Sequence, residues 1–391
     1  MQVLKQNSWL LVFSVLYIAL SGYLIWTDLA YLTLAPIGLM AIYFALFYTE
    51  YTFLALAFLT PLSINIEEYT DSFGLYIPTE PILFGLMLLL IMQHTKHKLI
   101  ENYVWKNPIV WAVGFYLFWM FITSITSTSP LTSFKFLLAR MWFIVPLLLF
   151  GTKVFSNLKN IRIFLWLFCL AMGIVIIYTL VVHASYGFGE KEGHWVMWPF
   201  FKDHTIYGST IAFITPLVFG LYFSKKHTPL VQVLLISMIL ITLLGLYFSS
   251  TRAAWLSVIL AVGVLVVIKL RIKFSILALV AATAGLVLFL SWDNIQMDLE
   301  RVKVEHTTEE FGEKLQSATN VTTDASNLER LNRWASALEM FKQKPIFGFG
   351  PGTYAFEYAR FQDPDNLTII STNFGDAGNA HSEYLGPLSE M

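Results

Sequence analysis

The chain has 391 residues, of which 57% are hydrophobic and only 13% are charged, and its formal net charge is -1. This composition excludes an ordinary soluble globular domain. A net charge so close to zero gives no overall attraction to nucleic acid, so we expect no nucleic-acid partner. The long apolar runs continue well inside the chain and are not a cleavable signal peptide. The sequence therefore predicts a polytopic membrane protein.

Eleven apolar runs predict transmembrane segments, at about 20 residues for each crossing. They must be helices, because lipid offers no partner to a backbone amide and the runs lack the alternation of barrel strands. The third and fourth runs are short, and the stretch SINIEEYTDSFGLYIPTE between them suits an interfacial helix or a re-entrant loop. The runs are 8–26, 29–47, 51–62, 79–92, 108–126, 131–150, 161–183, 207–224, 229–248, 253–268 and 274–291.

Basic residues orient this bundle. With the N-terminus inside, the predicted inner segments hold twelve Lys or Arg residues, whereas the short outer loops hold Lys191 and Lys202, apart from Arg252 at the outer start of a span. The positive-inside rule expects such a bias. We therefore expect a transmembrane bundle over residues 1–291 and an extracytoplasmic, largely helical loop region over residues 292–391. The inner residues are Lys5, Lys96, Lys98, Lys106, Lys153, Lys159, Arg162, Lys225, Lys226, Lys269, Arg271 and Lys273.

The polar region holds most of the candidate chemistry. Its first part, residues 292–327, is charged and weakly periodic, and no site residue is assigned to it. The following segment, LERLNRWASALEMFKQKP, predicts an amphipathic helix on the membrane or on the bundle, with Arg330 at its start. The apolar positions of that helix are Leu331, Trp334, Leu338 and Phe341.

Two further patterns in this region suggest phosphate or metal binding at first sight. The segment GFGPGTY (348–354) lacks the Lys-Ser/Thr pair of a nucleotide P-loop, so it predicts a tight turn that redirects the chain and not a phosphate cradle. Asp363 and Asp365 form a DxD pattern, but beside Pro364 they favour a solvated loop. Hence we expect neither a metal nor a cofactor.

Four motifs in order resemble those of the O-antigen ligase and polymerase superfamily. They are STRAAWL (250–256), ERLNRW (329–334), KPIFGFGPGTY (344–354) and AHSEYL (380–385). Members typically show an Arg four residues before a Trp, a turn similar to HPLLGVGPG, and an AHNxYL motif. The likeness is firmest from about residue 200 to residue 385. Here Ser382 replaces the common Asn, and members usually continue past position 391 into further spans, so we expect that C-terminal spans are missing.

The resemblance implies an integral-membrane glycosyltransferase in the bacterial inner membrane. It implies transfer of an O-antigen-like glycan from an undecaprenyl-diphosphate carrier to an acceptor hydroxyl. The acceptor could be lipid A core, a protein or the growing glycan, and the sequence does not separate ligase, polymerase and protein O-glycosylating roles. Placement outside the cytoplasm agrees, because no nucleotide sugar is supplied there and a lipid-linked diphosphate arrives already activated.

The resemblance also assigns site residues: the functional arginines of the family correspond to Arg252 and Arg330, and its motif histidine to His381. Guanidinium groups can neutralise a diphosphate leaving group without a metal. A histidine that titrates near neutrality can serve as the base for the acceptor hydroxyl. Direct attack in a single displacement should invert the anomeric centre.

Other ionisable residues have weaker claims. Arg140 lies within an apolar run, where charge is costly, so it is a candidate to line the substrate cleft or to form a structural pair. Lys135 is close enough to the outer end to snorkel. His204 is a secondary candidate for substrate binding, and Arg333 is expected to be a solvated or lipid-facing neighbour of Arg330. An alternative function is a transporter or flippase for lipid-linked oligosaccharide, although no convincing internal repeat is found. A structural scaffold would not need these motifs.

Overall fold

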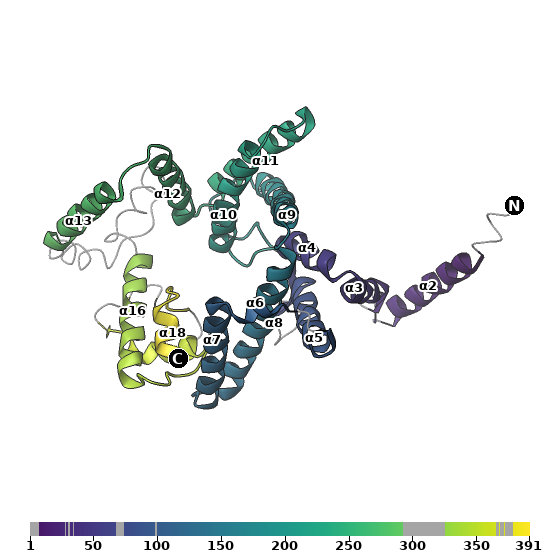
Figure 1. Ribbon diagram of the computed structural model, residues 1–391, viewed down its shortest axis with the longest axis horizontal. Helices are drawn as coiled ribbons and strands as arrows, with labels where there is room; N and C mark the ends of the chain where they lie inside the picture. Colours follow the sequence, from purple (N-terminus) through teal and green to yellow (C-terminus); the bar gives the residue numbers. More distant parts are fainter. Residues whose placement is uncertain are drawn as a thin grey trace.

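The computed structural model describes residues 8–27, 29, 32–33, 35–67, 74–97, 100–291, 325–364, 367, 371 and 378–391. Over these residues the chain is largely helical, with a group of long helices in the middle and shorter helices near the C-terminus (Figure 1). Within the described ranges, six helices are long and apolar enough to cross a membrane, and four more are shorter but apolar. The polytopic helical class is thereby confirmed, while the count of eleven spans stays a prediction.

Each of the eleven predicted runs coincides with a helix. These helices are α2 (Ser8–Trp26), α3 (Ala35–Phe47), α4 (Thr49–Leu59), α5 (Thr79–His97), α7 (Pro108–Ile125), α8 (Pro130–Val154), α9 (Leu158–Ser185), α10 (His204–Phe223), α11 (Pro229–Phe248), α12 (Arg252–Lys269) and α13 (Phe274–Leu290). Short helices connect some of them, namely η2 (Thr60–Leu62), α6 (Asn102–Trp105) and η4 (Glu192–His194). The six long candidates for membrane spans are α7 to α12.

Polar residues that flank the runs mark where several helices begin. The side chain of Asn107 accepts a hydrogen bond from the backbone N–H of Ile109 at 2.9 Å, and Pro108 occupies the first turn. Asp203 caps α10 in the same way through the N–H of Thr205 at 2.7 Å. These side chains satisfy amides that have no partner within the helix, so the helix starts follow from local chemistry.

The stretch between the third and fourth runs departs from the expectation of a helix. Strand β1 (Ile64–Asn65) pairs antiparallel with β2 (Tyr76–Ile77), with Ile64 opposite Ile77. At the base of this hairpin the hydroxyls of Ser63 and Thr79 are 2.5 Å apart. The interfacial helix is therefore wrong for the described ends of the stretch, where β-branched residues favour extended backbone. Residues 68–73 lie outside the described part.

Contacts between loops join segments that the predicted topology places on the same side of the membrane. Lys202 pairs with Glu67 at 3.0 Å, and both belong to predicted outer loops. The Asn160 amide donates to Glu50 at 2.5 Å, and both belong to predicted inner segments. The loops thus group as the alternation of spans requires. Which group faces the cytoplasm stays a prediction from the basic residues.

The last helices form a C-terminal module with its own small core. It consists of α16 (Ala325–Gln343), α17 (Tyr354–Glu357), η5 (Tyr358–Phe361) and α18 (Leu385–Glu390). Ala337, Met340, Phe349 and Tyr358 are buried in that core. Figure 1 shows α16 and α18 beside α7, near the C-terminus. Two larger cores lie in the bundle, one around α9 to α11 and one among α4, α5 and α8.

The glycine-rich turn fastens this module to the bundle. The carbonyl of Phe349 accepts a hydrogen bond from the N–H of Thr128 at 2.9 Å, and the carbonyl of Pro351 accepts from the Ser133 hydroxyl at 2.9 Å. Gly350 has φ of 113°, and a Cβ at that position would overlap the side chain of Ser127. Only glycine allows both the backbone conformation and the close approach. The predicted tight turn is confirmed.

The first prediction concerns topology. We expect a membrane-impermeant thiol reagent to label Lys342→Cys in intact spheroplasts, and Lys226→Cys only after permeabilisation, because the twelve-to-two basic bias places α16 outside. Both lysines are exposed, and the experiment uses a Cys169→Ser background because Cys169 is the single cysteine. Labelling of Lys226→Cys alone in intact spheroplasts would reverse the orientation.

The second prediction concerns the turn. Gly350→Ala should lower the melting temperature of the purified protein in detergent. An alanine at this φ carries backbone strain of about 1 to 3 kcal/mol, and its methyl group would collide with Ser127. Gly263→Ala is the matched control, since a Cβ there would meet nothing within 4 Å. Equal melting temperatures for the two variants would mean that the turn does not hold the module.

Candidate functional site

Helix α16 turns a polar face toward the rest of the C-terminal module. The sequence had predicted only that its apolar face would lie on the membrane or on the bundle. Its buried positions include Glu329, Asn332, Arg333 and Ser336, spaced as one face of a helix. The apolar stripe predicted from the sequence faces outward, with Trp334 37% and Leu338 43% exposed. The polar face can be buried because its side chains have hydrogen-bond partners within the module. The outward stripe still suits a helix that lies on the membrane.

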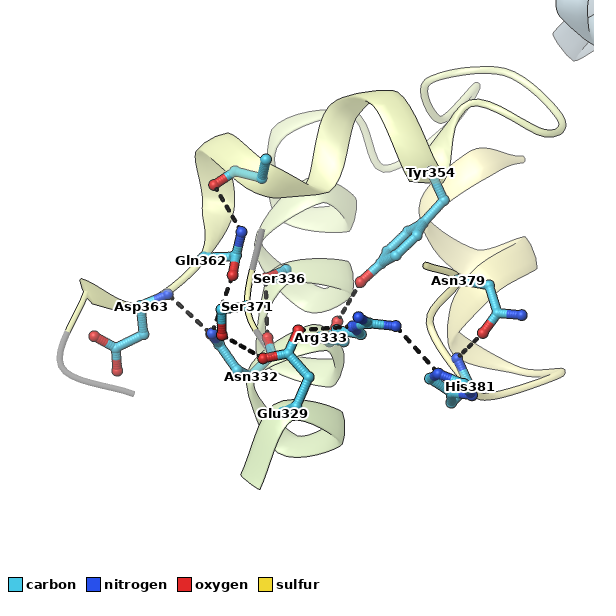
Figure 2. Close-up of polar contacts among 11 residues, drawn as sticks. Glu329, Asn332, Arg333, Ser336, Tyr354, Gln362, Asp363, Ser371, Asn379 and His381 are labelled. Atoms are coloured by element: carbon cyan, nitrogen blue, oxygen red, sulfur yellow. Dashed lines mark hydrogen bonds and ion pairs between the residues drawn. The ribbon is translucent and has the colours of Figure 1, made fainter. Parts of the chain in front are cut away.

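Arg333 lies at the centre of a hydrogen-bonded array (Figure 2). Its Nε donates to Glu329 Oε1 at 2.8 Å, in an ion pair whose two side chains are 9% and 3% exposed. Its Nη1 lies 3.1 Å from Nε2 of His381. On the other side, the hydroxyl of Ser371 donates to the second oxygen of Glu329. The array therefore runs from a buried carboxylate through a guanidinium to the motif histidine.

The expectation that Arg333 is solvated or lipid-facing is wrong. The residue is 8% exposed, and its guanidinium lies over the ring of Tyr358 at 5.6 Å. The Tyr354 hydroxyl donates to the backbone carbonyl of Arg333 at 2.7 Å, and burial raises the pKa of Tyr354 above its ordinary value. Arg330 is exposed instead. Arg330 and Arg333 are three positions apart on α16. The guanidinium of Arg333 is therefore buried while that of Arg330 is exposed.

His381 is held by its neighbours in the chain as well as by Arg333. Its φ is 46°, in the left-handed region, and its N–H donates to the side chain of Asn379 at 2.8 Å. The Ser382 hydroxyl accepts from the N–H of Leu385 at 3.1 Å at the start of α18, a role that the common Asn would also fill. The pKa of His381 is lowered, first by partial burial of the ring and then by the positive charges of Arg333 and Arg330.

Glu390 is a buried carboxylate that the sequence did not reveal. One of its oxygens accepts from the N–H of Tyr354 at 2.9 Å, and backbone N–H groups of Gly352 and Thr353 also bond to it. Burial, the largest effect, raises the pKa of Glu390, while these bonds and the charge of Arg140 oppose the rise. The amides of the glycine-rich turn are thus taken by a carboxylate of the protein itself, so they are not a cradle for phosphate.

A pocket of about 540 Å³ lies between the bundle and the C-terminal module. It brings two of the predicted residues together, since Arg140 of α8 and His381 both line it. Arg140 also lies over the ring of Phe136 at 5.0 Å. Other polar side chains in the lining come from Tyr116, Tyr354, Asn379, Ser382, Glu383 and Glu390. Cationic, anionic and hydrogen-bonding groups therefore share one cavity.

Arg252 and His204 do not line this pocket. Arg252 begins α12, and the hydroxyl of the preceding Thr251 donates to the backbone carbonyl of His204 at 2.9 Å. The ring of His204 lies 4.3 Å from that of His194, centroid to centroid. Figure 1 shows α12 apart from α16, which carries Arg330, and from α18, which follows His381 in the chain. The structure thus assembles Arg140 and His381, with Arg330 close by, and leaves Arg252 and His204 outside the pocket.

The DxD pattern has a structural role at its first residue. The N–H of Asp363 donates to the Asn332 side chain at 3.0 Å, which ties the loop to α16 (Figure 2). Asp365 lies outside the described residues. Among the side chains that are described, no group of three or more His, Cys, Asp and Glu residues could hold a metal ion.

Comparison with known proteins bears on the same part of the chain. No curated protein and no solved structure matches it. A family model described as O-antigen ligase matches residues 236–391, a stretch that includes α12, the whole C-terminal module and all four sequence motifs. The part of the chain that builds the pocket with α7 and α8, residues 236–391, is therefore similar to the O-antigen ligase family.

Proposed function

We propose that this protein transfers a glycan from an undecaprenyl-diphosphate carrier to an acceptor hydroxyl, at the outer face of the bacterial inner membrane. The acceptor is lipid A core, a protein or the growing glycan. The single observation that carries the proposal is the pocket of about 540 Å³, which Arg140 of the bundle lines together with His381 of the segment that matches the O-antigen ligase model. Its charge and hydrogen-bonding groups match a diphosphate and a sugar.

Guanidinium groups take the donor diphosphate in this proposal. Arg140 lines the pocket, and Arg330 is near enough for its charge to lower the pKa of His381. Each can form two parallel hydrogen bonds with phosphate oxygens and stays charged at any working pH. Arg252 remains a further donor-binding proposal at the start of α12, and it needs a separate test because it does not line the pocket.

His381 takes the acceptor proton in this proposal. The acceptor oxygen forms a bond to the anomeric carbon while the bond from that carbon to the phosphate oxygen breaks. The electron pair leaves with undecaprenyl diphosphate, and the acceptor proton passes to the imidazole. A base must be uncharged beforehand, and the lowered pKa of His381 keeps the ring neutral near pH 7. Single displacement inverts the anomeric centre.

Transport of the lipid-linked oligosaccharide is less well supported. Among the described residues, the buried Asp, Glu, Lys and Arg side chains are Glu329, Arg333 and Glu390, all of which belong to the C-terminal module. A transporter would be expected to bury ionisable groups near the middle of its bundle. The one-sided distribution of buried charge therefore favours chemistry at one surface.

The third prediction is independence of metal. Transfer should continue in excess EDTA, because arginines supply fixed positive charge for the leaving diphosphate. The measurement is transfer of glycan from a purified lipid-linked donor, with and without chelator. Loss of transfer that magnesium or manganese restores would instead make Asp363 and Asp365 candidate metal ligands.

The fourth prediction separates the arginines from the histidine. Arg330→Lys should keep part of the transfer activity and Arg330→Ala less, because lysine keeps the charge but loses the two-point contact. Each lost charge-assisted contact should cost about tenfold to a hundredfold in rate. His381→Ala should slow transfer about a hundredfold or more while leaving donor binding largely intact. The same comparison for Arg140→Lys and Arg252→Lys tests those two residues.

Donor binding and transfer should be measured side by side on protein in nanodiscs. Lys342→Ala is the matched control, because it removes a basic residue from the exposed side of the same helix, where Lys342 pairs with Glu339. Transfer at the parental rate by His381→Ala would sink the proposed mechanism.

A further inference from the structure

The environment of Arg333 goes beyond what a surface or phosphate-binding arginine needs. Its side chain is almost fully enclosed, its Nε is bonded to Glu329, and its Nη1 reaches His381. Gly378 lies so close that a Cβ on it would collide with the guanidinium. Arg333 itself does not line the pocket, whereas His381 does. The guanidinium therefore holds the histidine without itself belonging to the lining of the pocket.

Elementary chemistry then decides the state of the imidazole. A guanidinium has only donors and does not lose its proton in proteins. The nitrogen of His381 that faces it, Nε2, must therefore accept the hydrogen bond through its lone pair. In the neutral ring the single proton then resides on Nδ1. The contact at 3.1 Å thus specifies one tautomer.

We propose that Arg333, anchored by Glu329, is a positioning residue that holds His381 through Nε2 and fixes the neutral tautomer whose proton is on Nδ1, so that Nε2 is the nitrogen left to take up a proton. Glu329 is needed because a buried guanidinium without a carboxylate partner is costly. The anchor keeps Arg333 from pairing with Glu383 or with the diphosphate itself. This inference rests on the proposed function only for its effect on transfer.

The array also shapes the proposed proton transfer. The acceptor proton can enter only at Nε2, because Nδ1 already carries a proton, so the acceptor hydroxyl must take the place of Arg333 at Nε2 during the step. The two neighbouring positive charges then favour prompt loss of the proton. The ring is thus returned to its neutral state before the next acceptor arrives.

Removal of Arg333 and removal of Glu329 should shift the pKa of His381 in opposite directions. The positive charge of Arg333 lowers the pKa of His381, so Arg333→Gln should raise it. The negative charge of Glu329 raises that pKa, so Glu329→Gln should lower it. Loosening of the module would expose the ring in both variants and move both pKa values the same way. The other titratable or charged groups that adjoin the ring or its pocket are Arg330, Tyr116, Arg140, Tyr354, Glu383 and Glu390.

The test is exchange of the imidazole C2 hydrogen for deuterium, followed by mass spectrometry of the His381 peptide across a pH series. This gives the pKa of His381 in the whole protein in nanodiscs without an activity assay. Opposite shifts in Arg333→Gln and Glu329→Gln, with Lys342→Gln matching the parent, would support the proposal. Shifts of the same sign, or no shift in Arg333→Gln, would overturn it.

Transfer measured on the same variants provides the second arm. Below about pH 6.5, where an ordinary histidine becomes protonated, Arg333→Gln should lose about tenfold or more of its transfer, and the loss should shrink at higher pH. Arg333→Lys keeps the positive charge and should recover much of that loss, whereas recovery no better than Arg333→Gln would count against the proposal. If the parent transfers no glycan, the proposed function fails, while the exchange result still decides the role of Arg333.

Discussion

The candidate site depends on a close approach of backbone to backbone at the glycine-rich turn. The N–H of Gly350 donates to the carbonyl of Glu390 at 2.9 Å, while the carbonyls on either side of it bond to the loop and helix at the start of α8. One turn therefore joins the bundle, α17 and the end of α18. The pocket exists because these three elements are held at fixed separations. A side chain at position 350 would force apart the bundle and the C-terminal module, the two surfaces that line the pocket.

The helices were predictable because two local effects agree. Lipid requires internally bonded backbone, and polar capping residues such as Asn107 and Asp203 stand at the ends of the apolar runs. The hairpin at Ile64 and Tyr76 was not predictable, since strands of two residues carry too little alternation to be recognised. Its pairing depends on contacts that form only in the folded chain.

Two residues that line the pocket, Arg140 and His381, were predicted from the sequence. Arg140 stood out because a charge within an apolar run is costly, and His381 because of its motif. The choice between Arg330 and Arg333 could not be made, because positions three apart differ by only about 60° around a helix axis. Packing of Phe349, Tyr354, Tyr358 and Ala380 against α16 decides which one is enclosed. Glu390 gave no signal, since its partners are backbone amides more than thirty positions away.

The outward stripe of α16 has a consequence for how the lipid-linked donor of the proposed function would reach the pocket. Trp334 and Leu338 are exposed on the same side as Arg330, so that side offers apolar surface and a guanidinium together. A helix of this kind rests at the depth of lipid headgroups. Lifting a polyprenyl chain into water would cost about 0.8 kcal/mol for each CH₂ exposed. An entrance at headgroup depth would avoid that cost for the proposed donor, because its isoprenoid tail would stay in the hydrocarbon while the diphosphate entered the pocket laterally.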